Sequence, residues 1–388
     1  MKILYVSLEP LNSGSSASTC SVMNLIGLTR LGHEVEVLSI DRDVYKNRTY
    51  NQEILDHCQF SLVSQKGERK VDESMKASEV TKREVKPCGL SVRELAMQAY
   101  RKLSLYNYTY FYLKKVSLRC LKSSEYDVVI STSDPVTSHK AVAILKREGL
   151  KTNKWIQHWG DPMADDINRK NIWPTAIVRL VEQSILKQAD KVVYVSPFTA
   201  EKAKCIFNKL SGRMTYVIPA SEFNKQFEPS SGDIVRLAYC GLYYSETRDV
   251  LPLYDAVCNA KGCYLTIAGS TDVELDTVPN VKVMGYVSHD IAVKVEGDSD
   301  AIVCILNKCG TQIPAKLYYY FGTNKQIIVI YEDQNKRIVD FLNTFNRFMF
   351  ARNDRKSIED CFEILRKNRT ATASDYLSPE NVAKRLLE

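Results

Sequence analysis

The sequence predicts an α/β protein built from two Rossmann-like, doubly wound domains that face a central cleft. Short apolar runs typical of buried strands alternate with helical patterns along most of the 388 residues. A polar stretch containing Pro229, Ser230, Ser231 and Gly232 separates two such series, as a linker between domains does. With 45% hydrophobic residues, each domain can bury a core, so disordered and fibrous proteins are excluded.

The first domain is expected over residues 1–220. An apolar run at 2–8, a Ser- and Gly-rich turn at 12–16, a helical pattern at 17–31 and an apolar run at 35–40 give the β-loop-α-β start of a doubly wound sheet. Further strands are predicted at 127–131, 154–159, 191–195 and 214–218, and helices at 136–148, 174–189 and 197–207. Ligands bind beyond the carboxyl ends of strands in such sheets, so the loops after these runs should carry the chemistry.

The second domain is expected over residues 234–370, after a linker at 221–233. Its predicted strands are 237–240, 264–268, 281–284, 301–306 and 327–331, and its predicted helices are 249–260, 289–298, 314–322, 336–344 and 355–367. The remaining segment, 371–388, contains a helical pattern at 378–388. We expect this last helix to return to the N-terminal domain.

The cysteines and the apolar runs indicate a cellular location. Eleven cysteines without a Cys-x-x-Cys pair favour a reducing, cytoplasmic compartment over a disulfide framework or a zinc site. The N-terminus enters a strand pattern directly and does not read as a signal peptide. No apolar run reaches the roughly 20 residues of a membrane-spanning helix. Any membrane contact is therefore expected to be peripheral.

The net charge of +7 comes from one segment. Residues 66–122 hold 14 Lys or Arg and 6 Asp or Glu, a balance of 14 − 6 = +8, which leaves −1 for the rest of the chain. Tyrosines accompany the basic residues in 93–122, where a helical pattern is predicted at 93–121. This combination suits an anionic membrane surface at the inner face of the plasma membrane, and a solvated helix covering the sheet is the alternative. Nucleic acid is not expected as a partner, because no nucleic-acid-binding motif accompanies the segment.

Two strand-end loops of the first domain carry candidate site residues. Gly14 and Ser15 precede a helix N-terminus, whose free N–H groups suit an anion or a sugar hydroxyl; an ordinary capped turn is the alternative. At the end of a later strand, His158 lies between aromatic residues and close to Asp161. This histidine can hydrogen-bond a ligand or move a proton near neutral pH, or it can be a core histidine capped by the backbone.

The strand-end loops of the second domain carry Gly241, Arg248, Gly269, Ser270 and Lys316. The planar guanidinium of an arginine at a helix start bonds two phosphate oxygens at once. Lys316 lies in the first turn of a predicted helix, where free N–H groups add to its charge. A glycine after a strand allows a base or a ribose to approach the backbone. Together, this order of residues favours a diphosphate-binding site.

Several motifs resemble the retaining glycosyltransferases of the GT-B fold, family-4 type, over essentially the whole chain. The start KILYVS at 2–7, followed by a glycine-containing loop, is similar to the start of that family, and ADKVVYVS at 189–196 resembles one of its strands. The segment IPAKLYYYFG at 313–322 is similar to the family pattern Pro-x-Lys-x-x-Glu-Tyr-Leu. In that family the C-terminal domain binds a sugar nucleotide and the N-terminal domain binds the acceptor.

The resemblance implies roles for individual residues. Arg248 and Lys316 would hold the leaving diphosphate, His158 would lie near the reacting sugar and Gly14 beneath it. The residues expected to take part in catalysis are His158, Asp161, Arg248 and Lys316. Those expected to contact the donor are Gly14, Ser15, Gly241, Gly269, Ser270, Ile313, Pro314 and Tyr319.

The expected activity is transfer of a sugar from a nucleotide-sugar donor to a glycan or lipid-linked acceptor, with retention, in cell-surface polysaccharide synthesis. No metal or other cofactor is expected, because no Asp-x-Asp motif follows a strand in the second domain. Three positions depart from the family pattern: two glutamate positions are Thr311 and Tyr319 here, and an arginine position is Leu242. The alternatives are a catalytically altered GT-B binding protein and a sugar-nucleotide 2-epimerase.

Overall fold

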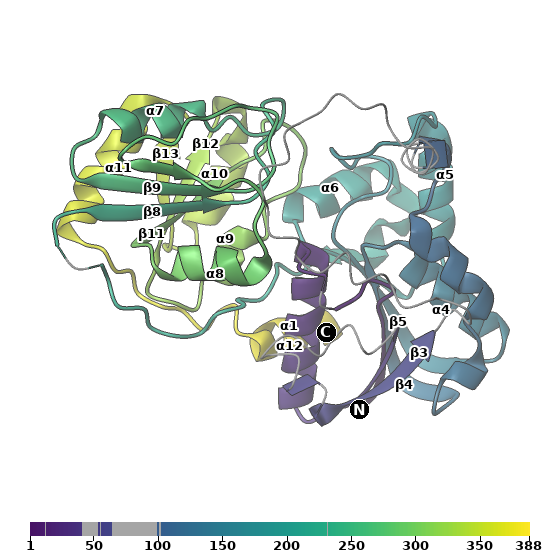
Figure 1. Ribbon diagram of the computed structural model, residues 1–388. Coiled ribbons are helices and arrows are strands. Elements are labelled where there is room, and N and C mark those ends of the chain that lie inside the picture. The colour runs from purple at the N-terminus through teal and green to yellow at the C-terminus, as the bar shows by residue number, and fades with distance from the viewer. Residues whose placement is uncertain (12, 41–52, 55, 64–98, 101, 231) are drawn as a thin grey trace, which may run out of the picture. The chain divides into compact units, whose positions relative to one another are not determined.

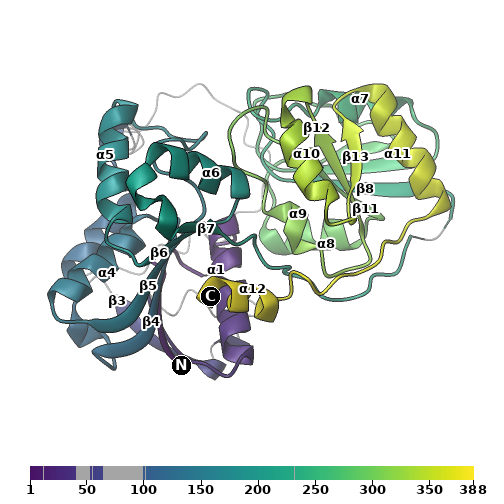
Figure 2. The same ribbon diagram turned by 180° about the vertical axis from the view of Figure 1, so that it is seen from behind.

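The structure, a computed structural model, describes residues 1–11, 13–40, 53–54, 56–63, 99–100, 102–230 and 232–388. The chain divides into two units, Met1–Val217 and Ile218–Glu388. Each unit contains one parallel β-sheet covered by helices (Figures 1 and 2). This arrangement confirms the predicted α/β class with two Rossmann-like sheets.

The sheet of the first unit has seven strands in the order β3-β2-β1-β4-β5-β6-β7. They are β1 (Lys2–Val6), β2 (Glu34–Ile40), β3 (Cys58–Val63), β4 (Glu125–Ser133), β5 (Lys151–Trp159), β6 (Lys191–Tyr194) and β7 (Met214–Tyr216). Strand β1 pairs in parallel with both β2 and β4, so the strand order reverses beside it. The loops that follow β1 and β4 therefore lie at the switch point of the sheet, where open α/β sheets bind ligands.

Two of the four α-helices that the structure describes in full in the first unit begin at a serine whose side chain caps them, Ser15 and Ser196, and the other two have no side-chain cap. The four are α1 (Ser16–Arg30), α4 (Thr137–Arg147), α5 (Thr175–Leu186) and α6 (Pro197–Ile206), with 3-10 helices η3 (Tyr108–Lys115), η4 (Leu118–Cys120) and η5 (Asn208–Arg213). The Ser15 side chain accepts a hydrogen bond from the Ser18 N–H at the start of α1. Buried residues such as Leu4, Val129 and Trp155 form the core of the unit.

The sheet of the second unit repeats this topology with six strands in the order β10-β9-β8-β11-β12-β13. They are β8 (Val235–Cys240), β9 (Cys263–Ala268), β10 (Val281–Val283), β11 (Ala301–Ile305), β12 (Gln326–Tyr331) and β13 (Met349–Arg352). The helices are α7 (Leu251–Asn259), α8 (His289–Gly297), α9 (Lys316–Tyr319), α10 (Lys336–Asn343), α11 (Arg355–Lys367) and α12 (Pro379–Leu387), with the 3-10 helix η6 (Asp333–Asn335). Strand β8 pairs with β9 and β11, so the switch point lies beyond Cys240.

Each predicted strand is present, and two strands were not predicted. These are β3 and β13, which lie at an edge of the first and the second sheet respectively. The helix predicted at 314–322 shortens to α9. The single helix predicted at 93–121 is wrong within the described part of that segment, which forms η3 and η4 instead. Asn107 and Ser117 each accept a hydrogen bond from a backbone N–H two residues on, and such local bonds compete with a continuous helix.

Two further expectations concern the chain as a whole. No helix among the described residues is long and apolar enough to cross a membrane. The ten cysteines in the described part of the chain are all free thiols. Residues 66–98 and 101 of the basic segment lie outside the described residues. The return of the last helix to the first domain stays a prediction.

Candidate functional site

Arg248 is held beside the carboxyl ends of β8 and β11 in the second unit. Its Nε donates a hydrogen bond to Asn307 Oδ1 at 2.9 Å, and its Nη1 donates to the Leu242 carbonyl oxygen at 3.1 Å. Asn307 follows β11 and Leu242 follows β8, so the guanidinium bridges the two strand-end loops. The Arg248 side chain also interacts with the Tyr239 hydroxyl group on β8. These contacts position the guanidinium at the carboxyl edge of the sheet.

Lys316, at the start of α9, forms an ion pair that the sequence did not reveal. Its Nζ donates to Glu296 Oε1 at 2.5 Å, and Tyr320 Oη donates to Glu296 Oε2 at 2.8 Å. Glu296 belongs to α8 and is buried. Burial is the largest single influence and opposes the charge of Lys316, but the charge and hydrogen bond of Glu296, together with Cys240 and Cys304, outweigh it and raise the pKa of Lys316. Lys316 therefore stays charged, and Glu296 balances its charge.

The charges of Arg248 and Lys316 affect the pKa values of the same two buried side chains, Tyr239 and Cys304. Burial raises the pKa of Tyr239 on β8 to about 12, while the charges of Arg248 and Lys316 oppose this rise. Burial also raises the pKa of Cys304 on β11 to about 12, and the same two cations oppose it. Since both groups lie near the carboxyl ends of neighbouring strands, the structure brings Arg248 and Lys316 together at this edge of the sheet.

The two predicted glycines of the second unit differ in the space around them. Gly269 has φ = +151°, and a Cβ there would lie 1.7 Å from the Gly241 carbonyl oxygen. Glycine is therefore required at 269 because the backbone of Gly241 packs against it. A Cβ at Gly241, in contrast, would meet nothing within 4 Å. The backbone at Gly241 thus borders open space beside Arg248.

The open space at Gly241 predicts how an added methyl group, as in Gly241→Ala, would affect stability and ligand binding. Gly241→Ala should leave the fold intact, because the new Cβ meets no protein atom and the φ of Gly241 is not in the left-handed region. If a ligand approaches the backbone there, the methyl group should weaken its binding about tenfold. Thermal melting and calorimetric titration with nucleoside diphosphates measure the two effects separately. Unchanged affinity for each nucleotide tested would remove Gly241 from the site.

The other residues of the second unit that were predicted to contact the donor take part mainly in backbone hydrogen bonds or are buried. The Ser270 carbonyl oxygen accepts a hydrogen bond from the Tyr243 N–H at 3.1 Å, and the Pro314 carbonyl oxygen accepts from the Leu317 N–H at 3.2 Å, at the start of α9. Ile313 and Tyr319 are buried. The Tyr319 carbonyl oxygen also accepts a hydrogen bond from Ser221 Oγ at 2.9 Å. Its burial and this hydrogen bond indicate that Tyr319 stabilises the fold of the second unit.

In the first unit, the loop after β1 carries its own carboxylate. Gly14 has φ = +77°, a conformation that favours glycine. Ser13 Oγ and Ser15 Oγ donate hydrogen bonds to Glu9 Oε1 at 2.6 and 3.0 Å. Ser15 also caps α1, as the alternative for this loop predicted. A carboxylate at this helix start repels a phosphate, so the loop suits a hydroxyl group better than an anion.

His158 is buried in β5. It is 4% exposed, and its Nδ1 is buried without a hydrogen-bond partner. Burial lowers the pKa of His158 to about 4, so the ring is neutral at physiological pH. The neighbouring His139, whose Nδ1 is 2.8 Å from Ser131 Oγ, has a pKa lowered to about 3 by burial and by His158. His158 therefore does not fit the predicted transfer of a proton near neutral pH.

Asp161 lines a cavity of about 400 Å³ in the first unit. Asp134, which follows β4, and Asp166 line the same cavity, with Tyr106 and Arg169 among its other residues. Asp134 is exposed to solvent as a residue, yet the density of protein around its carboxyl group and the negative charges of Asp161 and Asp166 raise its pKa to about 7. The sequence identified Asp161 alone, whereas the structure adds two carboxylates to it. No group of three or more metal-ligating side chains is arranged to hold a metal ion within the described ranges.

Comparison with known proteins identifies the fold. No protein-family model and no curated protein matches the sequence. HepE of Anabaena in complex with UDP and glucose is 10% identical, with a TM-score of 0.56 over 99% of this chain and 95% of that chain. S. aureus MnaA with UDP is 9% identical, with a TM-score of 0.51 over 100% of this chain and 94% of that chain. With its two Rossmann-like sheets, the chain has the glycosyltransferase-like GT-B fold that the sequence motifs predicted.

Proposed function

We propose that the chain is a glycosyltransferase that moves a sugar from a nucleotide-diphosphate donor to a glycan or lipid-linked acceptor. The observation that carries this proposal is the cluster of Arg248 and Lys316 at the carboxyl edge of the second sheet, beside the open backbone at Gly241. Fixed cations there stabilise the negative charge that develops on a leaving diphosphate. HepE was solved with UDP and with UDP-glucose, which supports a donor of this class.

The charged residues of the two units support separate roles for them, with the donor bound by one unit and the acceptor by the other. In the first unit, Asp134, Asp161 and Asp166 act on one cavity, and Glu9 adds to the negative field at Asp134. These carboxylates outnumber the two described cations that line the cavity, Arg169 and Lys170, so the site favours a diphosphate less than a sugar, whose hydroxyl groups donate hydrogen bonds to carboxylates. We therefore assign the donor to the second unit and the acceptor to the cavity of the first.

The proposal also covers the need for a metal ion, the stereochemistry of transfer, the biological role and the location of the enzyme. Because Arg248 stabilises the leaving diphosphate and Lys316, partly offset by Glu296, adds to this effect, we propose that transfer needs no divalent metal ion. Retention of the anomeric configuration and a role in cell-surface polysaccharide synthesis are part of the proposal and rest on the resemblance of the motifs at 189–196 and 313–322. A cytoplasmic location is also proposed, and it rests on the eleven cysteines without a Cys-x-x-Cys pair.

The test is a screen of nucleotide sugars with glycan and lipid-linked acceptors, with and without EDTA. One donor should be consumed in EDTA with release of a nucleoside diphosphate, and NMR should find the donor's anomeric configuration in the product. A 2-epimerised sugar would instead assign the chain as a sugar-nucleotide 2-epimerase. Binding of a donor without turnover would assign it as a binding protein.

The pKa of Asp134 predicts a pH dependence of acceptor binding. With a pKa of about 7, Asp134 loses its proton between about pH 6 and pH 8, and the ionised form accepts hydroxyl hydrogen bonds more strongly. The KM for the acceptor should therefore fall as pH rises through this range, while the KM for the donor stays constant. Asp134→Asn should remove the pH dependence. An unchanged profile in this variant would show that another group titrates.

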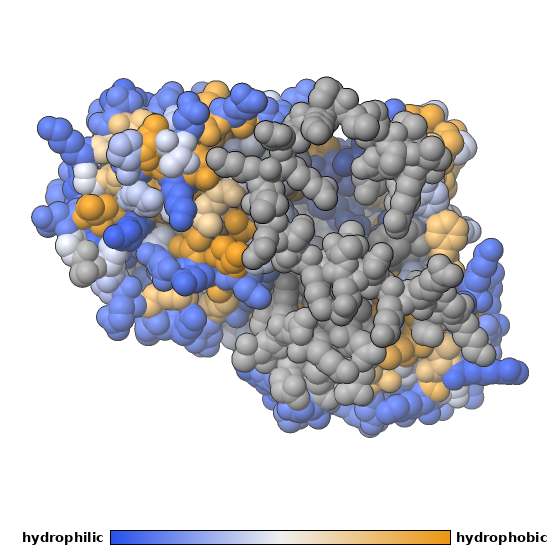
Figure 3. All heavy atoms as spheres, viewed as in Figure 1, coloured by the Kyte–Doolittle hydropathy of each residue, from blue (hydrophilic) through white to orange (hydrophobic). Residues whose placement is uncertain are grey.

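An exposed apolar patch in the first unit supports the expected membrane contact. It consists of Leu103, Ile172, Trp173, Ile177 and Leu180, which are 39% to 67% exposed. The Ile172 N–H and the Trp173 Nε1–H donate hydrogen bonds to the carbonyl oxygens of residues 102 and 103, so the two segments lie side by side. Apolar residues are visible at the surface over α5 in Figure 3. Exposed lysines at 102, 114, 115 and 170 accompany the patch, and we propose that it meets an anionic bilayer.

Leu180→Asp should weaken binding to vesicles containing phosphatidylserine about tenfold or more, because an exposed apolar side chain that would enter the bilayer is replaced by a charge that anionic lipid repels. Leu251→Asp, on an exposed leucine of the second unit, is the matched control and should change binding little. Vesicle sedimentation at low and high salt measures both variants. Binding that ignores lipid charge and salt, or equal effects of the two substitutions, would overturn the membrane assignment.

A further inference from the structure

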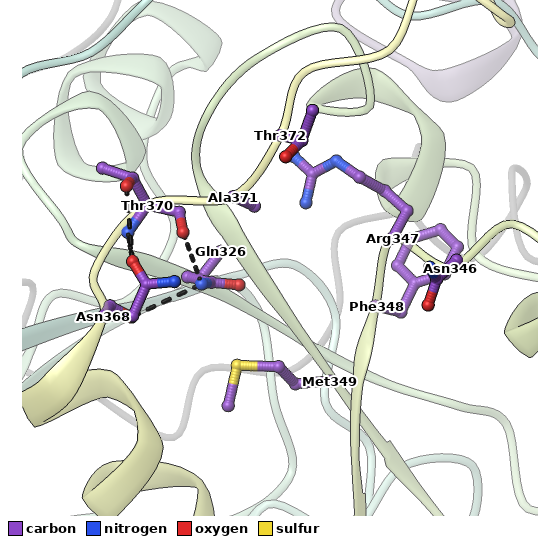
Figure 4. Close-up of a pocket in the computed structure, with 9 residues that line it drawn as sticks. All are labelled: Gln326, Asn346, Arg347, Phe348, Met349, Asn368, Thr370, Ala371 and Thr372. Atoms are coloured by element: carbon purple, nitrogen blue, oxygen red, sulfur yellow. Dashed lines mark hydrogen bonds between the residues drawn. The ribbon is translucent and has the colours of Figure 1, made fainter.

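The second unit contains a cavity at the amino-terminal edge of its sheet, opposite the edge that carries Arg248 and Lys316. Its volume is about 420 Å³, within the range of small-ligand pockets. Gln326 and Met349, the first residues of β12 and β13, line it. The remaining lining residues come from the chain before β13 and from the segment after α11: Asn346, Arg347, Phe348, Asn368, Thr370, Ala371 and Thr372 (Figure 4).

Among the described residues, Arg347 is the only charged one that lines this cavity, and none of its hydrogen bonds there goes to a carboxylate. It is 6% exposed, so about nine-tenths of the side chain is buried. Its Nη2 donates to the carbonyl oxygens of residues 320, 323 and 325 at 3.2, 2.9 and 2.7 Å, and its Nε donates to that of residue 321 at 3.4 Å. Its Nη1 is buried and has no hydrogen-bond partner in the described part of the chain.

Burying a cation without a negative partner costs free energy, and this cost appears as a lowered pKa of Arg347. Burial lowers the pKa of Arg347 to about 10. The carbonyl oxygens neutralise part of the charge, but Nη1 keeps two donor hydrogens without an acceptor. An anion at Nη1 would supply both the missing acceptor and the missing charge.

The rest of the cavity is suited to such an anion. Figure 4 shows the Arg347 side chain reaching toward Thr372, across the cavity from Gln326 and Asn368. Thr372 and Asn368 are exposed and carry hydroxyl and amide donors. Phe348 and Met349 are half-buried and provide an apolar wall. The lining thus combines one cation and several neutral donors with a surface for a carbon skeleton.

We propose that this cavity binds a small phosphate monoester. Because Nη1 of Arg347 is closed off from solvent, the phosphate group pairs with it after side chains at the cavity wall move aside. It receives further hydrogen bonds from the neutral donors around it, and the ester carbons lie against Phe348 and Met349. A phosphate offers more acceptor oxygens than a carboxylate, which matches the number of donors in the lining. This site is separate from the proposed donor site, because neither Arg248 nor Lys316 lines the cavity.

The test uses the full chain carrying Arg248→Ala, so that a phosphate cannot report on the proposed donor site. Titration calorimetry with glycerol 3-phosphate should give one binding site per chain, and acetate and glycerol should bind at least about tenfold more weakly. Arg347→Ala is unsuitable alone, since it leaves several buried carbonyl oxygens without a donor. Thr372→Glu instead places a carboxylate at the mouth of the cavity.

Thr372→Glu should weaken glycerol 3-phosphate binding about tenfold or more, because the new carboxylate pairs with Arg347 and repels the phosphate. Thr277→Glu, on an exposed threonine outside the cavity, is the charge-matched control and should change affinity less than about twofold. No binding at about 10 mM, equal binding of acetate, or full affinity in the Thr372→Glu variant would overturn the proposal. These outcomes do not depend on whether the chain binds a nucleotide sugar.

Discussion

Gly269→Ala should destabilise the second unit by more than about 3 kcal/mol or prevent its folding. The new Cβ would lie 1.7 Å from the Gly241 carbonyl oxygen, a covalent distance rather than a contact, and φ = +151° is unfavourable for alanine. The loops that follow β8 and β9 would have to separate. Urea unfolding followed by circular dichroism, together with the yield of soluble protein, measures the effect.

Gly241→Ala is the matched control for this prediction, because it changes the other member of the same glycine pair. Its Cβ meets no protein atom within 4 Å, so its stability should stay within about 1 kcal/mol of the wild type. The contrast between the two variants tests the backbone packing directly. Equal stability of both variants would mean that the loops after β8 and β9 do not pack as described.

Arg248→Ala should lower kcat/KM for the donor by about 10² to 10³-fold, since it removes a cation whose hydrogen bonds go to neutral oxygens at the proposed diphosphate site. Lys316 is already balanced by Glu296, so it compensates only in part. The loss should appear in kcat as well as in KM if Arg248 stabilises the departing diphosphate more than the bound donor. Steady-state kinetics with the donor found in the screen measure it.

Arg236→Ala provides the control for lost charge. Arg236 is an exposed residue near the start of β8, at the opposite end of the strand from Gly241. Its removal should change kcat/KM less than about twofold. If Arg248→Ala had no greater effect than Arg236→Ala, the proposed diphosphate site would be wrong.

The alternation of strands and helices predicted the fold because the central strands are buried on both faces. Strand β12, for example, has five buried residues in succession, which gives a continuous apolar run. The edge strands β3 and β13 lack this signal. In β3 the residues alternate between buried and partly exposed, and β13 has only one fully buried residue among four. Their pairing with β2 and β12 is long-range and leaves no local pattern.

The candidate site was predictable where it depends on topology alone. Arg248 and Lys316 follow strands of one sheet, and the carboxyl ends of parallel strands share an edge, so their proximity follows from the strand assignments. Glu296 was not predictable, because it precedes Lys316 by 20 residues and lies in a helix with no motif of its own. The buried places of His158 and Tyr319 also depend on packing that no spacing in the sequence reveals.

Calorimetric titration with UDP, GDP and ADP tests the central claim most directly. The proposal predicts that one nucleoside diphosphate binds the wild-type chain with 1:1 stoichiometry, that its monophosphate binds at least about tenfold more weakly, and that Arg248→Ala removes this difference. Equal affinity for the diphosphate and the monophosphate, or a diphosphate affinity unchanged by Arg248→Ala, would contradict the assignment of the donor to the second unit.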